Sequence, residues 1–394
     1  MQPSQFPKEK RPPTIFNKIG GEVEKRTQLG EKITALHIGD TYLPLPTELT
    51  TPYPGEDRLF GTMLNRYSDT MGDLPLRQLL LDKVIKRNHL PVTGLDCIQV
   101  TNGATGVLAS GFSRLVGAGN DVLTLAPYWT ILRIVADQAR VNLVEVPFFC
   151  YLAYKPEFDL IAHLEKHLTP ATKAIYINNP SNPTGMVLNR ITIEKLARFA
   201  QEHDLWVFSD EAYEDFIWDK DSPMISIGSL EGMFERTISV YTFSKCFGAS
   251  GLRVGYGVAP APVVAELNRG VVGSIYQVGR YDQLMAWRGM MRFETAVKPL
   301  FDNYVKTWEW VKENLKVQSL PSLATFYFFI YLGDDWKGLS SEETVNRFLN
   351  AGVVLSPGDS FGNAYDGWAR LCFTIEPPNE IQLAIEKLNS LLSR

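Results

Sequence analysis

The chain has 394 residues, of which 45% are hydrophobic and 21% are charged, a composition typical of globular proteins and unlike that of disordered or membrane-embedded chains. Its length exceeds the size at which one hydrophobic core stops growing, so we expect two domains. The formal net charge is −5, and the only basic run is Lys8, Lys10 and Arg11, which argues against nucleic acid as a partner.

Residues 1–30 predict a polar, proline-rich arm followed by a short amphipathic helix around residues 16–25. Arms of this kind often pack on a partner subunit. The arm lacks the apolar run of a secretory signal, and no segment approaches the roughly 20 apolar residues of a membrane helix. We therefore expect a cytoplasmic protein that is not bound to a membrane.

From residue 33 onward, short β-rich runs alternate with helical patterns. The segment 193–204 places its apolar residues at helical spacing and lies between two of these runs. A strand, a helix and a strand within about 35 residues form a βαβ unit, which predicts an α/β fold with a largely parallel sheet. The runs that we predict as strands are 121–126, 142–148, 174–177, 205–209 and 237–243.

The pattern changes after residue 275 to long helical stretches, then a strand-like run at 326–332 and a closing amphipathic helix at 380–392. The aromatic residues within 326–331 alternate along the predicted strand, so half of them should be core and say little about a pocket. We predict three parts: an N-terminal arm with part of the small domain (1–40), a large domain (41–275) and a small α+β C-terminal domain (276–394).

Lys245 stands at the end of a predicted buried strand in the segment YTFSKCFGASGLRVGYG. Burying a lysine cation is costly, and a Schiff base removes the charge, although a surface lysine at a strand end is also compatible with the sequence. Thr242, Ser244 and Arg253 surround it in the sequence. Hydroxyl and guanidinium donors of this kind bind phosphate, so the cluster suits a phosphorylated ligand.

Two further motifs follow predicted strands. INNPSNPTG at 177–185 places Asn182 where loops line the ligand crevice of an open α/β sheet, although Asn-Pro steps also form ordinary turns. FSDEAYEDF at 208–216 places Asp210 at a strand end, where it could pair with a pyridinium nitrogen, bind Mg²⁺ or cap a helix. Tyr213 could donate to a phenolic oxygen of the same ligand.

We predict no metal site. Cys97, Cys150, Cys246 and Cys372 are scattered without a CxxC spacing, which predicts neither a zinc site nor a disulfide framework. His163 and His167 stand one helical turn apart, but Leu164 replaces the glutamate of a metalloprotease helix, so they are expected on a solvated helix face.

Taken together and in this order, the motifs resemble the fold-type I pyridoxal-phosphate enzymes, specifically the class I/II aminotransferases, over residues 36–373. The resemblance implies a mostly parallel seven-stranded sheet between helices, and pyridoxal 5′-phosphate attached to Lys245 as a Schiff base. It implies that Asp210 pairs with the ring nitrogen, that Trp129 stacks on the ring, that Asn182 and Tyr213 hold the ring oxygen, and that the phosphate is bound by Gly103, Ala104, Thr105, Thr242, Ser244 and Arg253.

The resemblance also implies that Tyr67 reaches the phosphate of a second subunit, so that two active sites are shared in an obligate homodimer. Arg370 and Gly39, with Asn182, are implied to bind the substrate α-carboxylate. After Gly39 the chain reads Asp-Thr-Tyr, where the family pattern has proline and aspartate. Arg280 could meet an acidic substrate side chain, but an ion pair with a protein carboxylate is the favoured interpretation.

The implied function is transfer of an amino group from an L-amino acid to a 2-oxo acid, with Lys245, Asp210 and Tyr213 as catalytic residues. One alternative is a lyase of the same fold, either a carbon–sulfur β-lyase or an enzyme that cyclises S-adenosylmethionine. A remote alternative is a regulatory domain that senses the cofactor. That alternative needs an N-terminal DNA-binding domain, for which the first 30 residues leave no room.

Overall fold

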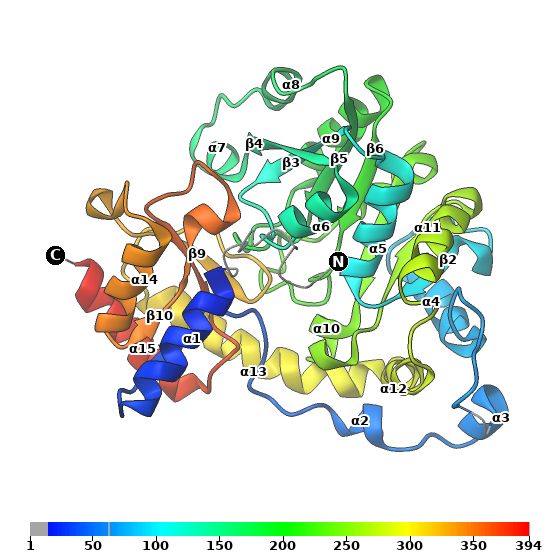
Figure 1. Cartoon of the computed structure of the whole chain (residues 1–394), viewed down its shortest axis with the longest axis horizontal. Coiled ribbons are helices and arrows are strands. Elements are labelled where there is room, and N and C mark those ends of the chain that lie inside the picture. The colour runs from blue at the N-terminus through cyan, green and yellow to red at the C-terminus, as the bar shows by residue number, and fades with distance from the viewer. Residues whose placement is uncertain (1–14, 62–63, 394) are drawn as a thin grey trace, which may run out of the picture.

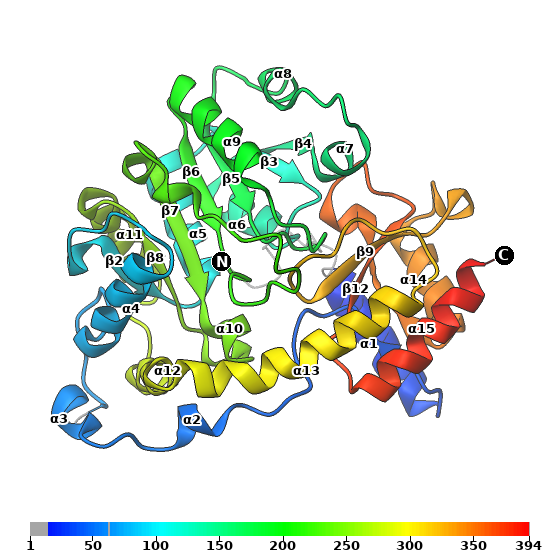
Figure 2. The same cartoon turned by 180° about the vertical axis from the view of Figure 1, so that it is seen from behind.

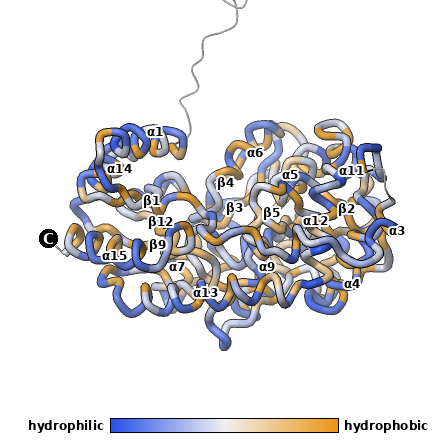
Figure 3. Tube along the Cα trace, turned by 90° about the horizontal axis from the view of Figure 1, so that it is seen from below, coloured by the Kyte–Doolittle hydropathy of each residue, from blue (hydrophilic) through white to orange (hydrophobic). Residues whose placement is uncertain are grey.

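The computed structural model describes residues 15–61 and 64–393. The predicted arm before residue 15, including Lys8, Lys10 and Arg11, lies outside the described residues. Figure 3 shows the chain from below, with α1, α14 and α15 gathered at one end of the molecule and the large sheet with its helices at the other. Nowhere in residues 15–61 or 64–393 does a helix have both the length and the apolar character needed to cross a bilayer.

A seven-stranded sheet forms the centre of the larger end, in the order β2-β8-β7-β6-β5-β3-β4. Strand β8 is antiparallel to both of its neighbours, and the other pairs are parallel. The predicted mostly parallel sheet is therefore confirmed. Its strands are β2 (Ile98–Thr101), β3 (Asp121–Ala126), β4 (Asn142–Pro147), β5 (Thr172–Asn178), β6 (Trp206–Asp210), β7 (Thr237–Thr242) and β8 (Gly255–Val258).

Helices cover both faces of this sheet, with α5 and α6 toward the viewer in Figure 1 and α9 in front of the strands in Figure 2. Burial on both faces explains why every residue of β3 is buried and why four of its six residues are apolar. The helices of this part are α4 (Leu74–Lys86), α5 (Ala104–Gly111), α6 (Leu132–Ala139), α7 (Phe149–Tyr154), α8 (Leu160–Glu165), α9 (Arg190–Glu202), α10 (Phe243–Cys246) and α11 (Ala261–Ser274).

A second body combines the two ends of the described chain. Its antiparallel sheet has the order β11-β12-β9, formed by Ser356–Pro357, Trp368–Cys372 and Tyr327–Tyr331, while β1 (Thr34–Ala35) pairs in parallel with β10 (Val353–Val354). Helix α1 (Ile15–Gln28) contacts α14 (Ser341–Asn350), because the fully buried Ile19 packs with Val345, Leu349 and Val354. Helix α15 (Pro378–Leu392) closes this body.

Helix α13 (Phe293–Asn314) joins the two bodies. Ala296 and Val297 near its start belong to the hydrophobic cluster that includes α4 and β8, whereas Tyr304 and Trp308 belong to the cluster that includes β9 and β12. The preceding helix α12 (Arg280–Met291) contacts α4 and the short α2 (Thr47–Thr50); α3 (Glu56–Phe60) follows α2 in the chain. The division into domains at residues 40 and 275 stays a prediction.

Candidate active site

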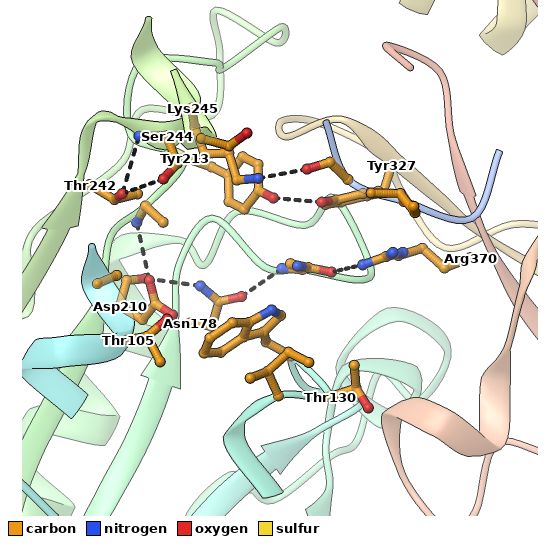
Figure 4. A pocket seen from close by; sticks show the side chains of 18 of the residues that line it. Thr105, Thr130, Asn178, Asp210, Tyr213, Thr242, Ser244, Lys245, Tyr327 and Arg370 are labelled. Carbon is orange, nitrogen blue, oxygen red and sulfur yellow. Dashed lines mark hydrogen bonds between the residues drawn. The ribbon is translucent and has the colours of Figure 1, made fainter. Parts of the chain in front are cut away.

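A cavity of about 410 Å³ lies where the ends of β5, β6 and β7 meet the smaller body. Figure 4 shows side chains from both bodies pointing into it, including Asp210 from the large sheet, Lys245 from α10, and Tyr327 and Arg370 from the small sheet. The cavity brings together most of the residues singled out in the sequence: Gly39, Ala104, Thr105, Trp129, Asn182, Asp210, Tyr213, Thr242, Ser244, Lys245, Arg253 and Arg370.

Hydrogen bonds fix the strand ends at this edge of the sheet. Asn178, the last residue of β5, donates from Nδ2 to the backbone oxygen of Asp210 over 3.0 Å. Its Oδ1 accepts from the amide of Asn182 over 2.6 Å, which holds the loop after β5 against the strand end. Parallel strands present their carboxyl ends at one edge, so these side chains face the same cavity.

One wall of the cavity carries hydrogen-bond donors suited to an anion. Arg253 lies beside Ser244, with 3.5 Å between its Nη1 and the Ser244 Oγ, and Thr242 Oγ1 donates to the same oxygen over 2.9 Å. Helix α5 begins after Gly103, and no described side chain caps it. A Cβ atom at Gly103 would lie 2.7 Å from Arg253 Nη2, so glycine is needed for this close approach.

Asp210 is buried and accepts two hydrogen bonds, from the Tyr176 hydroxyl over 2.6 Å and from the Ala212 amide over 3.2 Å. Burial raises the pKa of its carboxyl, while these two donors and the charge of Lys245 act in the opposite direction. The net effect raises the pKa of Asp210 above its usual value, and the two donors and Lys245 limit that rise.

Lys245 places its amine in the middle of the cavity. Its Nζ donates to the backbone oxygen of Gly39 over 2.7 Å and lies 5.6 Å from the centre of the Tyr213 ring. Burial lowers the pKa of the amine to about 8, although the charge of Asp40 acts against this. A lysine with this pKa is partly neutral near physiological pH and can act as a nucleophile or a base.

Arg370, in β12, is buried without an ion pair to any described carboxylate. Its Nη1 donates to Asn182 Oδ1 over 2.9 Å and its Nη2 to the His37 oxygen over 2.6 Å, while Nε has no partner among the described residues. The rings of Tyr327 and Phe361 flank the guanidinium, with centres at 4.4 and 4.9 Å. A buried cation of this kind suits a carboxylate ligand.

The sequence did not single out several residues that line the cavity: Phe16, Asn17, Ile38, Thr130, Ile131, Asn178, Ser250 and Tyr327. Tyr327 lies in the aromatic stretch 326–331, which we predicted to say little about a pocket, and this prediction was wrong for Tyr327 because it lines the cavity. Alternation along a strand tells which residues share a face, but it does not tell which face meets the cavity.

Tyr67 and Gly103 do not line the cavity of their own chain. The side chain of Tyr67 is 80% exposed and its ring packs edge-on against Tyr276, with 4.9 Å between the centres.

Arg280 does not line the cavity. Its Nε lies 3.1 Å from the carboxylate of Asp73, which is the ion pair with a protein carboxylate that the sequence favoured. His163 Nε2 lies 2.8 Å from the Pro147 oxygen, and the described residues contain no cluster of three potential metal ligands.

The family model described as "Aminotransferase class I and II" matches residues 55–388. The chain belongs to this family. Its members depend on pyridoxal phosphate, so this protein is a pyridoxal-phosphate-dependent aminotransferase. The family match thus identifies the reaction class, and nothing in the comparisons supports the lyase alternative.

Two curated relatives are 33% identical to this chain. The alignment with aromatic-amino-acid aminotransferase 2 of Thermococcus litoralis spans 92% of this chain and 91% of that protein. The alignment with an aspartate aminotransferase of Pyrococcus abyssi spans 92% of this chain and 90% of that protein. The aromatic aminotransferase structure from Pyrococcus horikoshii OT3 has a TM-score of 0.84 at 29% identity, with coverages of 94% of this chain and 98% of that one. A mutant Thermus thermophilus aspartate aminotransferase, 24% identical, shows the same fold at a TM-score of 0.86 over 97% of each chain.

The residues of the cavity fit this cofactor. The donors around Gly103 and Arg253 suit a phosphate dianion, and the close Gly103–Arg253 approach leaves no room there for a side chain. A buried carboxylate at Asp210 suits a protonated ring nitrogen, and a buried amine with a pKa of about 8 at Lys245 suits covalent attachment.

The position of Gly39 yields a first prediction. A Cβ atom there would lie 1.7 Å from the Tyr327 hydroxyl oxygen, so Gly39→Ala must displace either the Tyr327 ring or the Gly39 backbone, whose carbonyl accepts from Lys245. We expect at least a tenfold loss of kcat/KM. Gly20→Ala, in helix α1 with nothing within 4 Å of the new methyl group, is the control and should retain activity. Wild-type kinetics in Gly39→Ala would show that the carbonyl position is unimportant.

Proposed function

We propose that Lys245 holds pyridoxal phosphate in this cavity and that the enzyme transfers an amino group from an L-amino acid, preferably one with an apolar or aromatic side chain, to a 2-oxo acid. The observation that carries the proposal is the buried Lys245 amine, which donates to the backbone carbonyl of Gly39 and lies in one cavity with Asp210 and Arg370. A lysine in this setting is available for covalent chemistry.

The cofactor is held at three places. Thr105, Thr242, Ser244 and Arg253, with the amides at the start of α5, bind its phosphate. Asp210 keeps a proton on the ring nitrogen, and Tyr213 and Asn182 donate to the ring oxygen while Trp129 covers the ring. When bound, the cofactor supplies a ring that withdraws electrons from the substrate α-carbon.

With the cofactor bound, the neutral amine of Lys245 would be the base that takes the proton from the substrate α-carbon, and the same amine would give that proton back. Burial, which lowers the pKa of Lys245 to about 8, provides the neutral form. Tyr176 and Ala212 donate to the Asp210 carboxylate and so favour its ionised form against the effect of burial.

Arg370 binds the substrate α-carboxylate. Asn182 and the His37 oxygen accept from its two terminal nitrogens and so fix the plane of the guanidinium. Burial and the charge of Arg370 lower the pKa of His37 to about 4, so the imidazole beside the clamp is neutral and does not compete for the carboxylate.

The preference for apolar side chains rests on what else lines the cavity. Phe16, Ile38 and Ile131 are apolar, and the described basic residues that line it, Lys245, Arg253 and Arg370, already have roles. Arg280 neither lines the cavity nor lacks a partner, since it pairs with Asp73. The aromatic-amino-acid relative supports this preference, whereas the aspartate relative favours an acidic substrate as the second candidate.

We also propose a cytoplasmic homodimer with shared active sites. The exposed Tyr67 packs against Tyr276, which is itself 45% exposed, so this pair offers aromatic surface that a second copy would bury. Ser68 donates to Gln277, which holds the two segments together. Tyr67 would then donate to the cofactor phosphate of the other subunit.

The first test is the visible absorbance of the holoenzyme after single amino acids are added without any oxo acid. Phenylalanine or leucine should abolish the band of the lysine-bound cofactor and release about one oxo acid per site, faster than aspartate does. Lys245→Ala should bind the cofactor without this band and should not turn over, whereas Lys173→Ala, at an exposed position, should behave as wild type. A persistent band with accumulating ammonia would indicate a lyase.

The rate at which the apoenzyme attaches pyridoxal phosphate should depend on pH. Only the neutral amine attacks, so the rate should rise with pH and reach half its maximum near the Lys245 pKa of about 8. Borohydride reduction after timed exposure, followed by peptide mass analysis, measures attachment at this residue. A midpoint above pH 10 would mean that burial does not lower the pKa.

Mixing two inactive variants tests the shared site. If Tyr67 acts in the partner's site, dimers formed from Tyr67→Ala and Lys245→Ala subunits contain one site with both defects and one with neither. Subunit exchange at equal concentrations should restore about a quarter of wild-type activity, from statistical assortment of two subunits. No recovery despite demonstrated exchange would place Tyr67 in its own subunit's site, and full activity of Tyr67→Ala alone would remove it from both sites.

A further inference from the structure

Tyr327 contacts three residues to which the proposed function gives separate tasks. It is the first residue of β9, it is buried, and it lines the cavity. Figure 4 shows its side chain between Tyr213 and Arg370. We propose that Tyr327 is a positioning residue that both orients the hydroxyl proton of Tyr213 toward the cofactor and supports the guanidinium of Arg370, an inference that rests on the proposed function.

The contact with Tyr213 is a hydrogen bond between two hydroxyl groups, with 2.6 Å between the oxygens. Each hydroxyl has one proton. If Tyr327 donates to Tyr213, the proton of Tyr213 remains free to bond an oxygen in the cavity. If the direction were reversed, the proton of Tyr213 would point away from the cavity. Tyr213 can therefore donate to a ring oxygen only while it accepts from Tyr327, and this acceptance also makes Tyr213 a stronger donor.

The contact with Arg370 is a cation–π interaction, with 4.4 Å between the guanidinium carbon and the ring centre. Strands β9 and β12 fix this geometry, because Tyr327 is directly opposite Cys372 and therefore on the same face of the sheet as Arg370, two residues earlier. Ser322 Oγ also donates to the Tyr327 carbonyl over 2.8 Å. The ring is thus a rigid support beneath the proposed carboxylate clamp.

The contact with Gly39 links Tyr327 to Lys245. The Tyr327 hydroxyl oxygen lies so close to Gly39 that a Cβ there would be 1.7 Å away, and the carbonyl of Gly39 accepts from Lys245. One side chain therefore touches a proposed cofactor-binding residue, the proposed carboxylate clamp and the backbone that holds the proposed catalytic lysine. If Tyr327 only filled the core, its substitution would change the stability of the fold but neither cofactor binding nor carboxylate binding.

The test compares Tyr327→Phe with Tyr327→Met in the holoenzyme, with Tyr304→Phe as the control. Tyr304 is another buried tyrosine of the same hydrophobic cluster, its hydroxyl donates to Thr41, and it does not line the cavity. The readouts are the pH midpoint of the visible absorbance change of the lysine-bound cofactor and the dissociation constant of a monocarboxylate inhibitor. Neither readout requires turnover.

In Tyr327→Phe, the midpoint should rise by about half to one pH unit. The titrating atom is the nitrogen that joins Lys245 to the cofactor, and a weaker Tyr213 hydrogen bond stabilises the ionised ring oxygen less once that nitrogen has lost its proton. Inhibitor affinity should stay within about twofold, since the ring beneath Arg370 remains. In Tyr327→Met, affinity should fall about tenfold as well. Tyr304→Phe should change neither value.

An unchanged midpoint in Tyr327→Phe, while Tyr213→Phe shifts it, would overturn the inference and leave the proposed function intact. An unchanged midpoint in both variants would overturn the role of Tyr213 and with it this inference. A Tyr327→Phe midpoint shift matched by an equal shift in Tyr304→Phe would also overturn it, because the effect would then follow from any loss of a buried hydroxyl. The Phe variant preserves the ring, so it decides the result even if the Met variant does not fold.

Discussion

The cavity gathers three basic side chains, Lys245, Arg253 and Arg370, around a single described carboxylate, that of Asp210. Burying this excess of positive charge is unfavourable unless anions enter or the amine of Lys245 loses its proton. A phosphate near Arg253 and a carboxylate near Arg370 would satisfy both guanidinium groups, and covalent attachment would remove the charge of Lys245. The charge balance of one buried space therefore dictates which ligands it accepts.

Two hydrophobic bodies are needed to build this space, because neither contains all the charged groups. Asp210 is the last residue of β6 and Lys245 lies in the short helix α10 that follows β7, whereas Arg370 comes from β12 in the smaller body. Helix α13 connects the two cores through Val297 at one end and Trp308 at the other. A change in the packing of this helix would alter the distance between the clamp and the lysine, so the binding geometry depends on contacts far from the cavity.

The sequence predicted the residues whose roles depend on local context. Asp210 and Lys245 each stand at the end of a buried strand, and strand ends of a parallel sheet meet at one edge, so their convergence could be predicted. The position of Tyr327 could not, because its importance comes from tertiary contacts with Tyr213 and Gly39, which are distant in the sequence. The contribution of Phe16 depends on the packing of α1 against α14; the sequence predicts an amphipathic helix at 16–25 but not the element on which it packs.

The departure from the family pattern after Gly39 has a structural consequence. Asp40, where the pattern has proline, accepts from Ser250 Oγ over 3.1 and 3.0 Å and from the Thr41 amide over 3.0 Å. The carbonyl of Ser250 in turn accepts from Arg253 Nη1 over 2.8 Å. These hydrogen bonds connect the carboxylate side of the cavity, at Gly39, to the phosphate side, at Arg253. The chain thus replaces the rigidity of a proline with a hydrogen-bonded link, and the charge of Asp40 keeps the pKa of Lys245 from falling below about 8.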